Sequence, residues 1–140
     1  MLQEMRRGKR LCVAVLVNRL PDTNTILRYL IGDSVELHEQ SKVFYEEVRL
    51  GRQRAIILES VVVECVYVMT KFYNIPKERV SKSLISLLHY KGIINSDREE
   101  LIEALTIFTN RNIDIVDCVL LAKSKSLNIP IFTFDKKLRS

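Results

Sequence analysis

Hydrophobic and polar positions along the chain follow two periods, one typical of strands and one typical of helices. Leu11–Val17 is an unbroken apolar run that predicts a buried strand, and between Ile26 and Ile31 the apolar residues recur at helical spacing. The same alternation continues to the end of the chain. It predicts further strands over 54–58 and 129–134, and further helices over about 35–50, 60–73, 77–89, 97–109 and from 114.

Local signals support these boundaries. Ser96 and Glu99 match a capping box, with Ser96 as the N-cap of the helix that follows. Strands that alternate with helices imply right-handed crossovers and a largely parallel sheet, so the carboxyl ends of the strands share one edge. With 140 residues the chain builds one core. We therefore expect a single α/β domain.

Composition excludes several classes of protein. The chain is 47% hydrophobic and 28% charged, as in soluble globular proteins, and no apolar run reaches the ~18 residues of a membrane span. Basic residues before Leu11–Val17 resemble the start of a signal peptide, but 18–21 lacks the small-residue cleavage site. We expect a cytoplasmic protein that is not exported. Cys12, Cys65 and Cys118 lie in apolar segments and are expected to be reduced core residues.

The balance of charge is moderately basic. Lysine and arginine number 22 against 17 aspartates and glutamates, which gives a net charge of +5. This balance favours a polyanionic partner such as a nucleic acid without establishing one.

Several acidic residues stand at places where a structural explanation competes with a functional one. Asp22 follows the first predicted strand and is placed to cap a helix. Glu64 is surrounded by apolar residues, and it either belongs to a narrow solvent-exposed stripe or is buried against a cation. Asp114 is placed as an N-cap and Asp117 at the third helical position, and Asp135 suits a turn. For Asp117, which is crowded by apolar neighbours, the functional interpretation is preferred.

These acids become informative when they are considered together. Asp22 and Asp135 follow strands, Glu64 lies on the helix after a strand, and Asp117 begins the helix before the last strand. We expect three of these four acids at one edge of the sheet. Like-charge repulsion there requires a counter-charge, and ligation by oxygen alone favours Mg²⁺ or Mn²⁺ over Zn²⁺. A basic protein with such a pocket is suited to hydrolysing nucleic acid.

The residues in this order resemble the PIN-domain nucleases, and in particular the VapC-type toxins of toxin-antitoxin pairs. The resemblance extends from about Pro21 to the C-terminus. It rests on Asp22-Thr23-Asn24 with Arg28-Tyr29-Leu30, Ser60 to Glu64, Asp114-Ile115-Val116-Asp117 and Thr133-Phe134-Asp135. It implies a three-layer α/β/α domain with a central, mainly parallel sheet.

The resemblance also implies an activity and a set of site residues. By analogy, the chain is an endoribonuclease that cleaves single-stranded or loop RNA with Mg²⁺ or Mn²⁺. It forms a homodimer, and a cognate VapB-type antitoxin blocks its pocket. The implied catalytic and metal-binding residues are Asp22, Glu64, Asp117 and Asp135, with Asn24, Thr133 and Asp114 in supporting roles.

The chain departs from the family pattern near its start, where 18–21 stands between the apolar run and Asp22. Either Leu11–Val17 is the first strand and a turn follows it, or the strand is a short piece of 17–20 preceded by an extension. We accordingly assign residues 1–20 to an extension, the first strand or both, and residues 21–140 to the PIN-like domain.

Other functions remain open from the sequence. Within the same family, an RNA-processing or DNA-directed nuclease is the nearest alternative to a toxin. A phosphoacceptor signalling domain also gathers carboxylates at a sheet edge, but it requires a lysine after the last strand, where this chain has Asp135. A binding module whose acids serve as helix caps is the third alternative.

Overall fold

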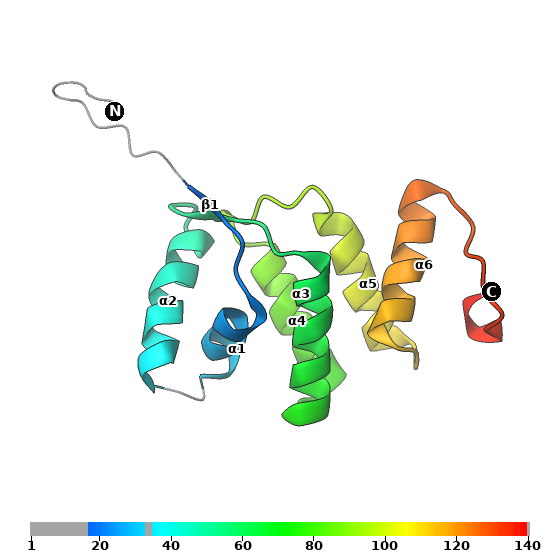
Figure 1. The fold of residues 1–140 in the computed structure, drawn as a ribbon, viewed down its shortest axis with the longest axis horizontal. Coiled ribbons are helices and arrows are strands. Elements are labelled where there is room, and N and C mark those ends of the chain that lie inside the picture. Colours follow the sequence, from blue (N-terminus) through cyan, green and yellow to red (C-terminus); the bar gives the residue numbers. More distant parts are fainter. Residues whose placement is uncertain (1–16, 33–34, 140) are drawn as a thin grey trace, which may run out of the picture.

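The computed structural model describes residues 17–32 and 35–139, in which helices predominate over two short strands (Figure 1). The strands are β1 (Asn18–Arg19) and β2 (Arg54–Ala55). The helices are α1 (Thr23–Ile31), α2 (Val35–Arg49), α3 (Glu59–Tyr67), the π-helical η1 (Val68–Phe72), α4 (Lys77–Leu88), α5 (Arg98–Asn110), α6 (Ile115–Leu127) and the 3₁₀-helical η2 (Lys136–Leu138).

The two strands pair in parallel, as the alternation of strands and helices predicts. Asn18 is opposite Arg54 and Arg19 is opposite Ala55, and Ala55 also forms an isolated parallel bridge with Ile93. Strand pairing begins at Asn18, and Leu11–Leu16, the body of the apolar run predicted as a strand, lies outside the described residues. The second strand ends at Ala55, three residues before its predicted end.

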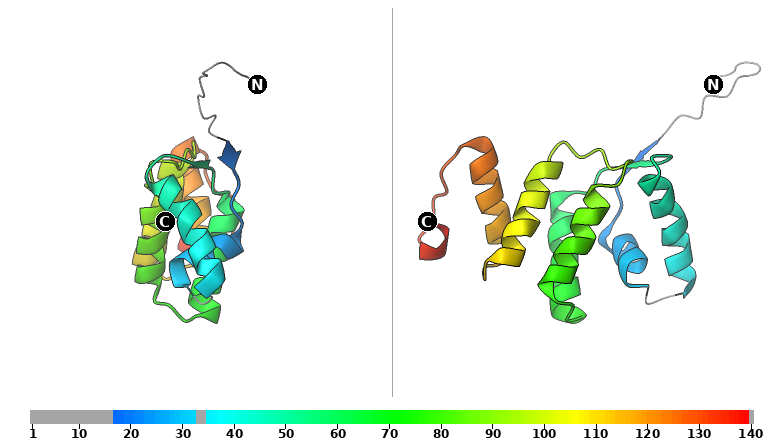
Figure 2. Two further views of the ribbon diagram at one scale, coloured as in Figure 1. Left: turned by 90° about the vertical axis from the view of Figure 1, so that its left-hand side faces the viewer. Right: turned by 180° about the vertical axis from the view of Figure 1, so that it is seen from behind.

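The strand predicted over 129–134 is wrong. After Asn128 ends α6 in the left-handed conformation, the chain continues without regular structure to η2. Phe132 is 90% exposed and Phe134 82% exposed, and their rings contact each other at a centroid distance of 5.5 Å. The views in Figures 1 and 2 place this segment at the opposite end of the molecule from β1. The apolar pattern suits a strand, but no partner strand lies within its reach in residues 17–32 and 35–139.

The predicted helices are present, with small differences at their ends. Asp22 is the N-cap of α1, and Gly32 ends this helix with φ +71°, a conformation that glycine adopts without strain. The third predicted helix divides into α3 and the π-helical η1. The predicted capping box is wrong, because α5 begins at Arg98 with Asp97 as its N-cap, which places Ser96 one residue too early.

The order in which the helices pack determines where the site residues lie. α1 packs on α2 and on α3, while α6 packs on α5 and on α3. Figures 1 and 2 agree that α3 lies between α1 and α6 along the long axis of the molecule. The hydroxyl of Tyr29 on α1 further joins Glu46 of α2 at 2.9 Å and Tyr90 at 2.6 Å. Residues of α3 can therefore meet the beginnings of both α1 and α6.

Burial of large side chains stabilises this arrangement, at roughly 1.5–3 kcal/mol for each fully buried aliphatic residue. The core includes Ile26, Tyr45, Ile57, Leu87, Leu88, Ile93, Leu101, Leu105 and Ile115. At Gly92 the backbone packs directly against the backbone of Gln53. Only glycine fits there, because a Cβ atom would lie 2.0 Å from the Gln53 carbonyl oxygen. The Gly92 N–H donates to the Val48 carbonyl at 2.8 Å, and its carbonyl accepts from Ala55 at 2.9 Å.

The described residues also bear on the expectations about membrane spans and cysteines. None of the helices in these residues combines the length and apolar character needed to cross a membrane. Cys65 and Cys118 are buried and free, as predicted for core thiols, while Cys12 lies outside the described residues. Burial raises the pKa of Cys65 to about 12 and that of Cys118 to about 11, so both thiols stay protonated near neutral pH.

Candidate active site

Asp22 is fixed at the start of α1 by its capping interaction. Its Oδ1 accepts a hydrogen bond from the Thr25 backbone N–H at 3.0 Å, and its own backbone is extended. The expected capping role is therefore confirmed. The cap occupies one carboxylate oxygen and fixes the direction of the exposed side chain, which leaves the second oxygen as a potential ligand.

Glu64 reaches the same end of α1 from α3. The hydroxyl of Thr23, the first residue of α1, donates to Glu64 Oε1 at 2.5 Å. Glu64 is exposed, so the structure supports the solvent-exposed stripe and not burial. Burial is the main cause of the raised pKa of the Cys65 thiol, and the negative charges of Glu64 and Asp22 raise this pKa further. The two carboxylates therefore lie in one region beside α1.

Asp114 and Asp117 lie at the start of α6, where the helix dipole favours negative charge. Asp114 has the expected N-cap position, but its side chain makes no capping bond and instead accepts a hydrogen bond from the Tyr67 hydroxyl at 2.6 Å. This bond raises the pKa of Tyr67 to about 12, with smaller effects from burial and from the charges of Asp114 and Asp117. Tyr67 thus connects α3 to the acids of α6.

Asp135 and Thr133 are positioned by the turn that begins η2. Asp135 Oδ1 accepts from the Lys137 backbone N–H at 2.9 Å, and the Asp135 N–H donates to Thr133 Oγ1 at 3.0 Å. The turn expected for Asp135 is confirmed, although no strand precedes it. Arg111 donates to the Lys137 carbonyl at 2.7 Å, and the buried Leu138 also anchors this turn.

The C-terminal acids share one cavity of about 580 Å³. Asp114, Asp117 and Asp135 line it together with Tyr67. Basic side chains lie in the same lining: Lys71, Lys77 and Lys137. Carboxylates that can hold a cation therefore stand beside ammonium groups that can bind an anion.

Lys77 is itself held in place within this cavity. Its Nζ donates to the Arg111 carbonyl at 3.1 Å and lies 5.8 Å from the centroid of the Phe108 ring. A cation–π contact of this kind restrains the ammonium without neutralising it. The positive charge of Lys77 is thus kept at the edge of the acidic cavity.

The remaining predicted residues line neighbouring cavities. Thr133 lines a cavity of about 410 Å³ to which Asp117 and Asp135 also contribute. Asn24 lines a third, of about 600 Å³, together with Asp22. Asp117 and Asp135 therefore line both the cavity of about 580 Å³ and the cavity of about 410 Å³, whereas Asp22 lines the cavity of about 600 Å³.

The four predicted metal ligands form two pairs in the structure. Asp22 lies with Glu64 at the start of α1, and Asp117 lies with Asp135 beside α6. Within 17–32 and 35–139, no three of these four place ligand oxygens within 4.8 Å of one another. α3 connects the pairs, since Glu64 and Tyr67 are three residues apart on one helical face.

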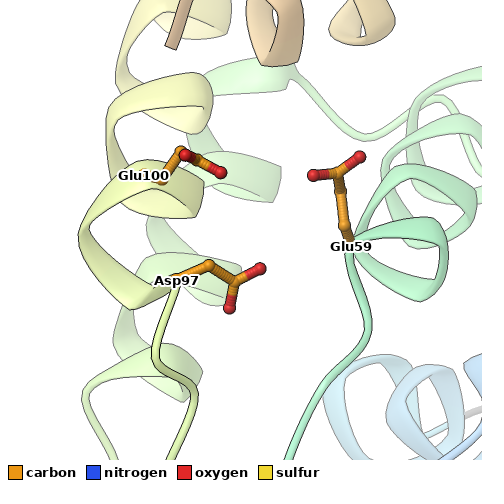
Figure 3. A group of neighbouring side chains, drawn as sticks. All are labelled: Glu59, Asp97 and Glu100. Carbon is orange, nitrogen blue, oxygen red and sulfur yellow. The ribbon is translucent and has the colours of Figure 1, made fainter. Parts of the chain in front are cut away.

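A different acidic trio does bring carboxylate oxygens within 4.8 Å of one another: Glu59, Asp97 and Glu100 (Figure 3). Figure 3 shows the Glu59 carboxylate at the start of α3 opposite those of Asp97 and Glu100 at the start of α5. The ammonium of Lys123 contacts Glu100 at 2.5 Å and Glu59 at 3.1 Å. An internal cation therefore already compensates much of this negative charge.

Sequence reasoning did not identify the basic lining of the cavity or the role of Tyr67. The helical spacing of Glu64, Tyr67 and Lys71 gave a signal, because it placed them on one face of a helix. Lys77 and Lys137 lie on elements far apart in the chain, and no local pattern associates them with the acids. The Glu59 trio was likewise missed, since its members are separated by up to 41 positions, from Glu59 to Glu100.

Comparison with known proteins identifies the class to which this fold and these acids belong. The family model described as PIN domain matches residues 19–140, and the chain belongs to the PIN domain family. The α/β PIN-like fold expected from the sequence is therefore confirmed, with its strand pairing limited to β1, β2 and the Ala55–Ile93 bridge among the described residues.

One curated relative is similar over most of the chain. A VapC ribonuclease of Aquifex aeolicus (strain VF5) is 24% identical over 123 residues, which cover 86% of this chain and 90% of the relative. No solved structure matches the chain. The family assignment and this relative together support a PIN-family nuclease.

Proposed function

We propose that the protein is a Mg²⁺- or Mn²⁺-dependent endoribonuclease that hydrolyses RNA phosphodiester bonds. The observation that carries this proposal is the cavity in which Asp114, Asp117 and Asp135 stand beside three lysines. Hydrolysis of a phosphodiester requires a group that activates water and positive charge that stabilises the phosphate in the transition state. The family and the ribonuclease relative support the same activity.

The side chains fit a hard divalent cation in their chemistry. The proposed ligands form two pairs, Asp22 with Glu64 and Asp117 with Asp135, and both pairs offer carboxylate oxygens, which suit Mg²⁺ and Mn²⁺. Asp22 and Asp135 each use only Oδ1 for capping, so their second oxygens can serve as ligands. A cation held by these carboxylates would activate water as a nucleophile at neutral pH and would neutralise charge on the scissile phosphate.

The remaining residues of the site bind and orient. Lys71, Lys77 and Lys137 bind the phosphates of the RNA backbone, for which an ammonium is a suitable partner. Tyr67 holds the Asp114 carboxylate through its hydroxyl. Asn24 and Thr133 support the acids beside them, and the two capping bonds keep Asp22 and Asp135 from rotating freely.

We also propose that this nuclease is the toxin of a type II toxin-antitoxin pair and acts in the cytoplasm. Its VapC relative supports this biological role. A cognate VapB-type antitoxin would then block the pocket, and the toxin would be a homodimer. Growth arrest on expression, relieved by the product of a neighbouring gene, would distinguish a toxin from an RNA-processing or DNA-directed nuclease of the same family.

Cleavage of a structured RNA with and without Mn²⁺ tests the activity. Asp117→Asn and Asp22→Asn should each lower the cleavage rate about 100-fold or more, because each removes a ligand charge from the site. EDTA should abolish cleavage by the unaltered protein. Glu59→Gln is the matched control, since it alters the acidic trio that Lys123 compensates, and it should cleave at close to the original rate.

Two results would contradict the proposal. Cleavage that survives both aspartate substitutions would remove the proposed site. Loss of activity in Glu59→Gln with retention in Asp117→Asn would move the metal to the Glu59, Asp97 and Glu100 trio. Calorimetry with Mn²⁺ separates an enzyme from a binding module, because acids that serve only as caps should give no saturable heat.

A further inference from the structure

The first turn of α1 carries hydroxyl groups to which the proposed chemistry assigns no role. Thr23 is the first residue of this helix and is only 8% exposed. A buried hydroxyl destabilises the folded state unless it forms a hydrogen bond. Thr23 forms this bond with the Glu64 carboxylate, which lies 41 positions further along the chain on α3. The residue next to Asp22 is therefore joined directly to the second acid of the pair.

The bond between Thr23 and Glu64 fixes one carboxylate oxygen and leaves the other available. The Thr23 hydroxyl has a single proton, and it donates this proton to Oε1 at 2.5 Å. The Glu64 side chain is long and exposed, and it takes part in no salt bridge within residues 17–32 and 35–139. Thr23 is accordingly the group that restrains the direction of this carboxylate in the described part of the chain.

A second hydroxyl anchors the backbone of the same turn. Thr25 Oγ1 donates to the Asp22 carbonyl at 3.0 Å, and the Tyr45 hydroxyl lies 2.8 Å from the same threonine oxygen. Because the one proton of Thr25 Oγ1 is used on Asp22, Tyr45 is the donor in the second contact. Tyr45 is fully buried on α2, and its ring stacks on Tyr29 at a centroid distance of 4.8 Å. The turn that carries Asp22 and Thr23 is thus connected to the core.

These bonds hold the two acids without neutralising them. Oδ1 of Asp22 caps α1 and Oε1 of Glu64 accepts from Thr23, so each acid keeps a second oxygen and its negative charge. The contrast is with Glu59, whose carboxylate is compensated by the ammonium of Lys123 at 3.1 Å. A neutral donor orients a carboxylate and leaves its charge to attract a cation. The first turn of α1 therefore has the chemistry of a support for metal ligands.

We propose that Thr23 is a positioning residue, which holds the Glu64 carboxylate in the orientation that binds the cation. Tyr45 supports this arrangement from the core through Thr25. The inference rests on the proposed metal-dependent function, and it adds residues that touch neither the metal nor the RNA. Loss of a group that orients a metal ligand commonly lowers metal affinity by about 10- to 100-fold. The role of Thr23 is therefore measurable as metal binding, without RNA and without cleavage.

Titration of the full-length protein with Mn²⁺ tests the role of Thr23. Isothermal titration calorimetry measures the affinity of the site that Glu64→Ala weakens. Thr23→Val removes the hydroxyl and keeps the branched shape, and it should weaken this affinity by about 10-fold. Thr23→Ser keeps the hydroxyl and should restore most of the affinity. The matched control is Thr109→Val, which removes a half-buried hydroxyl that donates to the Leu105 carbonyl on α5, and it should leave the affinity unchanged.

Double-mutant cycles separate a positioning role from a general structural one. In Glu64→Ala no carboxylate remains to be held, so the addition of Thr23→Val should change Mn²⁺ affinity little. Tyr45→Phe should weaken binding in the unaltered protein and also in Glu64→Ala, because it acts on the turn that carries Asp22. Urea unfolding in EDTA tests the bond without metal, and Thr23→Val and Glu64→Ala should have non-additive effects on the free energy of unfolding.

The inference fails on any of three results. Thr23→Val weakening Mn²⁺ binding equally with and without the Glu64 carboxylate would make Thr23 a structural residue only. Additive effects on unfolding would show that the two side chains are not bonded in solution. Absence of any Mn²⁺ binding that depends on Glu64 would contradict both this inference and the proposed function. If Mn²⁺ binding depends on Thr23 through Glu64 but RNA is not cleaved, the proposed function fails and the positioning role stands.

Discussion

Capping and ligation compete for the same carboxylates at the scale of single residues. Asp22 and Asp135 use one oxygen each to hold a backbone N–H, and Asp114 gives its Oδ1 to Tyr67. These bonds explain why each acid occurs where it does without any ligand. They also restrict rotation of the side chains, which lowers the entropy lost when a metal is bound. A capping bond is therefore compatible with the ligand role proposed for Asp22 and Asp135, because it leaves the second carboxylate oxygen of each unused.

The hydrogen bond between Tyr67 and Asp114 makes the stability of the folded protein decrease at alkaline pH. The pKa of Tyr67 is raised to about 12 in the folded protein, against about 10 in an unfolded chain. Its contribution to stability is therefore complete below pH 10 and is lost as the pH rises through 12. Melting temperatures measured across this range should fall more steeply for the unaltered protein than for Tyr67→Phe.

Asp114→Asn tests the same hydrogen bond from the side of its acceptor. Because it weakens the hydrogen bond that Tyr67 donates and removes the carboxylate charge beside it, tyrosinate absorbance should show the pKa of Tyr67 moving down toward 10. A Tyr67 transition that stays in place in Asp114→Asn would mean that Asp114 is not its partner in solution.

At the scale of elements, the sequence pattern and the fold disagree in the segment that follows α6. Alternating apolar residues predicted a strand over 129–134, but a strand is stable only against a neighbour, and this segment lies beyond α6, far from β1 (Figure 2). The helices were predicted with greater success, because each helix satisfies its backbone hydrogen bonds within its own residues. Their ends were predicted less well where a cap was chosen by the tertiary structure, as at Asp97.

Substitution of the two exposed rings tests this segment directly. Phe132→Ala and Phe134→Ala should each change the free energy of unfolding by no more than about 0.5 kcal/mol, because neither side chain is buried. Leu105→Ala, in the core, should cost about 2–5 kcal/mol in the same urea titration. A loss of about 3 kcal/mol or more at either phenylalanine would show that the segment is packed against the body of the protein.

At the scale of the whole molecule, the acidic groups repel one another across a fold that also carries a net charge of +5. A cation that binds only the folded state adds to stability according to its concentration relative to its dissociation constant. At a hundredfold excess over that constant the gain is about 2.7 kcal/mol, which corresponds to a rise in melting temperature of roughly 10 °C.

Mn²⁺ should therefore raise the melting temperature of the unaltered protein and of Glu59→Gln, but not that of Asp117→Asn. Differential scanning calorimetry with and without Mn²⁺ measures this. An equal rise in all three proteins would assign the binding to other acids.

The amino-acid sequence by itself determined the helices, their approximate limits and the acidic residues proposed for the site. Helical periodicity, caps and the spacing of Asp114 and Asp117 are local, and short-range sterics and hydrogen bonds are sufficient to specify them. The motif around Asp22, Glu64, Asp117 and Asp135 also identified the family, which the PIN domain match confirms.

Only the tertiary structure decided which of these residues meet. It placed α3 between α1 and α6, joined Glu64 to Thr23 and Tyr67 to Asp114, and set three lysines beside the C-terminal acids. Within the part of the chain that the structure describes, it left 129–134 without a strand partner, and it placed the ammonium of Lys123 against Glu59 and Glu100. Such contacts depend on how whole helices pack, and packing responds to the shape of the entire core, which no short stretch of sequence contains.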